Sequence, residues 1–118
     1  MPVNYPLLAV YKSLYLVQES ILAVQLALDN NPSPEDGIQL NDKLSDLDTL
    51  KDELQVMRDG LQDGSVSIPP PDPSLLDHLK DLISRVEAAT QAGITATAVI
   101  AVVSLAFDTG TAVMSLAK

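Results

Sequence analysis

Cysteine is absent from this 118-residue sequence, and aromatic residues make up only 3% of it. The lack of cysteine excludes disulfide bonds, thiolate metal sites and cysteine nucleophiles together, and it leaves the redox compartment undetermined. Because large rings are scarce, a core must be built from Leu, Val, Ile and Ala, which favours the packing of helices on helices. The length suits one domain with a modest core, so we expect residues 1–118 to form a single all-α domain.

Charge is also scarce at both ends of the chain. The formal net charge of −9 belongs to residues 29–87, which hold fourteen of the sixteen acidic residues and five of the seven basic ones. Such an acidic field repels phosphate, and no basic stripe or aromatic platform offsets it, so we expect no nucleic-acid partner. The two ends, in contrast, each sum to zero charge, are apolar and need to be covered.

Residues that could carry catalysis or hold a metal ion are few. His78 is the sole histidine, and it lies among acidic residues at the start of an expected helix. The stretch 29–40 has the length of a calcium-binding EF-hand loop, but Pro34 stands where that loop needs glycine and Leu40 where it needs a bidentate glutamate. The five glycines are scattered, which excludes a phosphate-binding loop. We therefore expect no enzyme, no cofactor and no metal site.

A classical secretory signal is not visible. The first basic residue, Lys12, lies inside the apolar stretch, and no clear small-residue cleavage site follows it. We expect a cytoplasmic or non-classically exported protein, and the compartment stays open.

The first apolar segment predicts a helix over residues 5–29. Its apolar residues alternate steps of three and four, which is the spacing of a heptad seam. A second apolar column, Leu8, Tyr15 and Leu22, runs beside the seam, so the helix is apolar around most of its circumference. The seam that we expect to make contacts consists of Leu7, Val10, Leu14, Val17, Ile21, Val24 and Leu28.

The stretch Asn31-Pro32-Ser33-Pro34 predicts a turn into a second helix over residues 34–61. Proline cannot continue the first helix, Ser33 can cap the next one, and Pro34 suits its first position. Leucine recurs at every seventh residue of this second helix, and its other faces are charged. We therefore expect the leucine face to be buried in a bundle and the other faces to be exposed to solvent. Residues 64–74, rich in proline, predict an extended connector.

This helix–turn–helix stretch is similar to the hairpin of type III secretion needle subunits, small helical proteins that polymerise. The similarity rests on the Asn31-Pro32-Ser33-Pro34 turn between a helix and a leucine-rich helix, and it covers about residues 20–60. The third segment of this chain has no counterpart in that family, so no membership follows.

The third segment keeps the heptad spacing through residues 73–117 and predicts a long third helix, which gives an antiparallel bundle of three long helices with heptad packing. If this third helix were continuous, its length would be about 65 Å, whereas each of the first two helices would be about 38 Å long. Either the helix is kinked or split into a fourth near Gly93 or 108–110, or its second half projects and a second copy covers it. We favour self-association, with contacts at Gly93, Ala96, Ile100, Val103 and Phe107.

The functional expectation is a non-enzymatic structural or interaction protein that assembles with itself, as a homo-oligomer or filament, or with another helical protein. The alternative is a membrane-active or membrane-anchored protein that inserts residues 88–107, which contain no charged residue. Polar residues interrupt that stretch, and flanking basic residues and aromatic belts are missing, so the protein partner is favoured.

Overall fold

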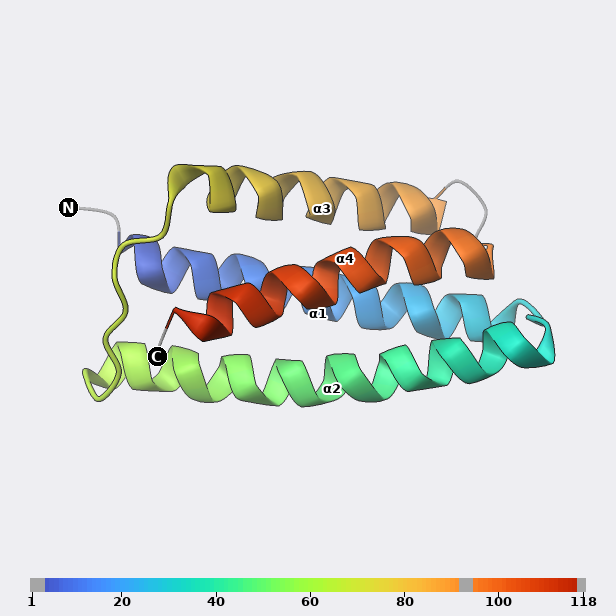
Figure 1. Ribbon diagram of the computed structural model, residues 1–118, viewed down its shortest axis with the longest axis horizontal. Coiled ribbons are helices and arrows are strands. Elements are labelled where there is room, and N and C mark those ends of the chain that lie inside the picture. Colours follow the sequence, from blue (N-terminus) through green and yellow to red (C-terminus); the bar gives the residue numbers. More distant parts are fainter. Residues whose placement is uncertain (1–3, 92–94, 117–118) are drawn as a thin grey trace.

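Four helices run up and down along one axis in the computed structural model, which describes residues 4–91 and 95–116 (Figure 1). They are α1 (Tyr5–Asp29), α2 (Pro34–Asp63), α3 (Pro73–Gln91) and α4 (Ala96–Ser115). The all-helical bundle expected from the sequence is therefore confirmed, with four helices packing against one another in place of three.

The third segment does not form one long helix but is split into two, the alternative that the sequence left open. α3 ends at Gln91, and α4 begins after Thr95, whose side chain accepts a hydrogen bond from the Ala98 N–H at 3.3 Å. α4 then runs back alongside α3 (Figure 1). The chain turns because a threonine cap satisfies the start of α4, and because folding back buries its apolar face without a second copy. Gly93, near which we placed a kink, lies outside the described residues.

The predicted turn between the first two helices is confirmed. Ser33 caps α2 by accepting a hydrogen bond from the Asp36 N–H at 3.2 Å, and Pro34 occupies the first helical position. Asn31 adopts a φ of 51°, the left-handed conformation that asparagine tolerates. α2 continues to Asp63 and stops at Gly64, which has a φ of 85°.

The bundle is flattened because two of its helices approach across the centre. α1 and α4 each contact all three other helices, whereas α2 and α3 have no contact between their described residues. α2 and α3 therefore lie at the two edges, with α1 and α4 between them (Figure 1). The resulting extents are 47 × 23 × 18 Å.

The proline-rich connector links the two helices that do not touch. It crosses one end of the bundle between α2 and α3 (Figure 1), held by the buried side chains of Ile68 and Pro71. At its end, Asp72 accepts hydrogen bonds from the N–H and the hydroxyl of Ser74 at 3.0 and 2.9 Å, which lowers the pKa of this carboxyl. An extended connector suits this path because the distance across the bundle is long.

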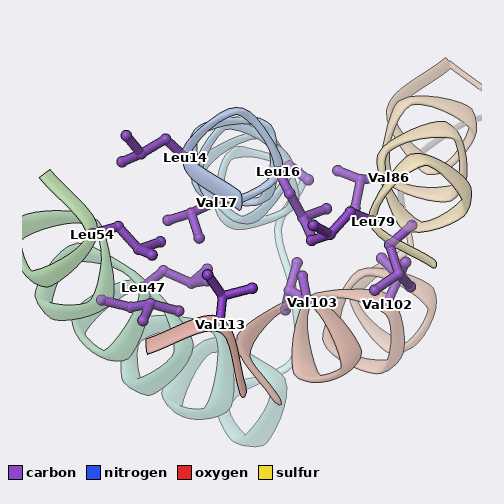
Figure 2. Close-up of a cluster of buried hydrophobic side chains, with 14 of the residues drawn as sticks. Leu14, Leu16, Val17, Leu47, Leu54, Leu79, Val86, Val102, Val103 and Val113 are labelled. Carbon is purple, nitrogen blue, oxygen red and sulfur yellow. The ribbon is translucent and has the colours of Figure 1, made fainter. Parts of the chain in front are cut away.

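α1 buries side chains toward three partners. Figure 2 shows Leu16 directed toward Leu79 and Val86 of α3. Val17, the next residue of α1, is directed toward the side of the bundle where Leu47 and Leu54 of α2 lie. Between these two directions the buried sector of α1 carries small residues, which allow another helix to come close. These are Ala9, Ser13, Ser20 and Ala27, and the hydroxyls of both serines bond to carbonyls of their own helix.

Gly110 marks the close approach of α4 to α2. A Cβ atom at this position would lie 2.7 Å from Leu50 Cδ2, and the Leu50 side chain is itself buried. Real Cβ atoms do not show such a distance, so a side chain there requires the Leu50 side chain or the two helices to shift.

A Gly110→Leu variant is expected to lose about 1–3 kcal/mol of the free energy of unfolding, because overpacking forces side chains and backbone to shift. Gly37→Ala is the matched control. Its added Cβ would meet only Pro32 Cγ at 3.9 Å, so the better helix propensity of alanine should raise stability by up to about 1 kcal/mol. Denaturant unfolding monitored by circular dichroism measures both, and an unchanged Gly110→Leu variant would contradict the α2–α4 contact.

Candidate interaction surface

The described part of the chain holds no group of three or more His, Cys, Asp or Glu residues that could bind a metal ion. His78 is exposed in the first turns of α3. In residues 4–91 and 95–116, every buried polar side-chain atom has a hydrogen-bond partner, so none is directed at a missing ligand. The surfaces of the bundle are therefore where function is to be sought.

A small groove lies between α2 and α4. Its volume is about 220 Å³, below the usual range of small-molecule sites. Its walls combine carboxylates with apolar side chains, and no group of polar side chains converges on one point where a ligand could be held. Its lining residues are Asp46, Thr49, Leu50, Glu53, Phe107, Thr111 and Met114. We assign no ligand to it.

Exposed apolar side chains gather on α1. Eight large hydrophobic residues are exposed in the described part of the chain, and five of them belong to this helix. Four share one side of it, because their spacing of four, seven and four residues follows the helical repeat. We call this side the outer α1 face: Tyr11, Tyr15, Leu22 and Leu26, which are 43%, 46%, 45% and 39% exposed.

The outer α1 face exists because α1 is apolar around most of its circumference while its partners cover only one side. The buried sector of the helix is directed toward α2, α3 and α4, so the residues on the opposite side stay in contact with water. The sequence showed Tyr15 and Leu22 as part of a second apolar column, but Tyr11 and Leu26 were missed. Their helical spacing was the available signal.

A groove of about 420 Å³ runs between α1 and α3 beside this face. The hydroxyl of Tyr11 accepts a hydrogen bond from Gln62 Nε2 at 2.6 Å, which ties this ring to the end of α2. The negative charges of Glu87 and Glu19 raise the pKa of Tyr15, so both carboxylates lie near its hydroxyl. The lining residues are Tyr11, Lys12, Tyr15, Lys80, Ile83, Ser84 and Glu87.

α4 presents a second apolar surface. Ala98 and Ala101 are exposed on it, together with Leu105, which is 42% exposed. By length and composition, α1 and α4 are both apolar enough to cross a membrane, with 50% and 39% of their most apolar windows buried in the bundle. The buried cores of soluble proteins pass the same test, so the bundle accounts for part of this composition.

The residues predicted to make contacts between copies lie mostly inward. Of this set, Val10, Leu14, Val17, Val24 and Val103 are buried against other helices of the same chain. The half-buried members are Leu7, Ile21, Leu28, Ala96, Ile100 and Phe107, and Gly93 lies outside the described residues. The heptad spacing shows which side chains are buried. In this protein, most of them are buried by other helices of the same chain.

No family model, curated protein or solved structure matches this chain. Its function must therefore be inferred from the surfaces of the bundle and their chemistry.

Proposed function

We propose that this protein is a non-catalytic helical interaction protein that self-associates through the outer α1 face. The observation that carries the proposal is the concentration of exposed apolar side chains on α1, where Tyr11, Tyr15, Leu22 and Leu26 share one side of the helix. Water exposure of these side chains is unfavourable, and exposed apolar surfaces mark sites of protein contact.

The partner best suited to this face is another helix. Leu8, Tyr15 and Leu22 recur at intervals of seven, the spacing with which side chains of one helix fit between those of a second helix in heptad packing. Tyrosine favours such contacts because its ring is apolar and its hydroxyl can remain at a wet rim. A homo-oligomer supplies the complementary helix without requiring a different protein.

The oligomeric state in detergent-free buffer tests this proposal. We expect sedimentation equilibrium to show a mass that rises above that of the monomer with concentration. Leu22→Glu should shift the equilibrium toward the monomer, because it places a charge in the apolar contact. Val56→Glu, at a residue of α2 that is 71% exposed, is the matched control and should associate like the parent protein. A parent protein that remains monomeric at high concentration would refute self-association.

The second candidate is a membrane-active protein, supported by the apolar length of α1 and α4. Residues 88–107 do not form one helix, since α3 ends at Gln91 and α4 starts at Ala96, so α4 carries this candidate. Insertion requires α4 to leave the bundle and expose Val99 and Val103 to lipid. Flotation with phosphatidylcholine vesicles separates the candidates, since self-association through α1 gives no lipid-bound fraction.

A further inference from the structure

Two helices that border the α1–α3 groove repeat the same pair of charges. α1 and α3 run in the same direction (Figure 1), and each carries a lysine followed seven residues later by a glutamate. Lys12, Lys80 and Glu87 line the groove itself, and Glu19 lies with Glu87 near the Tyr15 hydroxyl. The groove therefore has a positive end and a negative end, about 10 Å apart along the helices.

Within residues 4–91 and 95–116, these four charges have no ion-pair partner. The described residues form two ion pairs, Arg58–Asp59 and Arg85–Asp81, and neither includes a residue of the groove. With Glu19 of α1 counted beside the lining residues Lys12, Lys80 and Glu87, these charges sum to zero, although the whole protein has a net charge of −9. The groove of a second copy can therefore meet this one without net repulsion between the two sets of charges.

We propose that a second copy packs antiparallel on the outer α1 face, so that Lys12 and Lys80 of each copy lie opposite Glu19 and Glu87 of the other. The inference rests on the proposed self-association and specifies its geometry. Parallel two-fold packing would set the groove of one copy against the α2 side of the other, whereas a two-fold axis midway between residues 12 and 19 pairs opposite groove charges at both ends. That axis passes beside Tyr15, which places the two Tyr15 rings at the centre and Leu8 of each copy near Leu22 of the other.

Two-fold packing also determines the size of the assembly. Both copies use the same surface, so the contact is closed once two chains have met. A dimer follows from this surface, and filament growth would need another one. The apolar centre contributes attraction, while the charged groove selects the antiparallel register.

Charge reversal tests the register. Lys12→Glu/Lys80→Glu makes the groove wholly negative, and Glu19→Lys/Glu87→Lys makes it wholly positive. Each variant alone should lose about tenfold or more in dimer affinity, because two-fold symmetry repeats every repulsive contact. An equimolar mixture of the two variants should form a mixed dimer at least as tightly as the parent protein, measured by sedimentation or by fluorescence energy transfer between labelled copies.

Lys43→Glu/Lys51→Glu is the matched control, because it changes the net charge by the same amount on α2, away from the groove. It should leave the dimer affinity within about twofold of the parent value, since distant surface charges are largely screened. Circular dichroism verifies that each variant is folded.

Each other outcome overturns the inference in a distinguishable way. A monomeric parent protein refutes the proposed function itself. A parent dimer that tolerates both charge reversals, or variants that do not pair with each other, refutes the antiparallel register while self-association stands. Filaments in place of dimers refute the closed contact. Binding of the parent protein to phosphatidylcholine vesicles that Leu22→Glu abolishes would assign the outer α1 face to lipid.

Discussion

A Val103→Asp variant is expected to release α4 from the bundle and abolish cooperative thermal unfolding. The Val103 side chain is fully buried, and it lies in the apolar cluster with residues of α1 and α3 (Figure 2). An unpaired carboxylate there costs several kcal/mol whether it remains ionised or takes up a proton. That cost is comparable to the total stability of a small domain, about 5–15 kcal/mol.

Ala101→Asp provides the matched control, because Ala101 is exposed on the same helix. Its expected loss is below about 1 kcal/mol, the difference in helix propensity. Thermal unfolding followed at 222 nm, together with limited proteolysis of residues 95–116, distinguishes the two variants. If Val103→Asp melted like the parent protein, α4 could not be packed as the structure describes.

A Leu47→Ala variant is expected to lose about 2–5 kcal/mol of the free energy of unfolding, since deletion of a buried leucine removes apolar contacts and leaves a cavity. Leu47 is fully buried and belongs to the central cluster with Leu54 of α2 and Val17 of α1 (Figure 2). α1 and α4 pack against α2 and also against each other, so collapse around the cavity should be incomplete.

Val56→Ala in the same helix controls for a change of helix propensity. Val56 is 71% exposed, so its truncation should alter stability by no more than about 0.5 kcal/mol. Urea unfolding measures both, and an unchanged slope with a lower midpoint would show that Leu47→Ala acts on the folded state. Equal midpoints for the two variants would contradict the burial of Leu47.

The first helical hairpin could be predicted from its residues. Pro32 stops α1, Ser33 caps α2 and Pro34 starts it, and each does so through contacts within a few positions of the chain. Local chemistry of this kind does not depend on the rest of the fold. The end of this helix was predicted less well, since α2 runs to Asp63, two residues beyond the predicted end at 61, and stops at Gly64.

The third segment could not be predicted in the same way. The heptad spacing continues from α3 into α4, so the pattern was the same for a projecting rod and for two helices folded together. Thr95 is the local signal that was missed, because a single threonine cap within an apolar stretch is weak on its own. The choice between the two arrangements depends on whether α1 and α2 leave room for α4.

The sequence by itself determined that the chain is helical, where its first turn lies, and that its charge is concentrated in the middle. Only the tertiary structure decided that α4 folds back, that the predicted seam of α1 is covered by its own chain, and that Tyr11, Tyr15, Leu22 and Leu26 face outward. The physical reason is that apolar periodicity shows which side of a helix avoids water, but not which helix covers it. That depends on contacts between residues far apart in the chain.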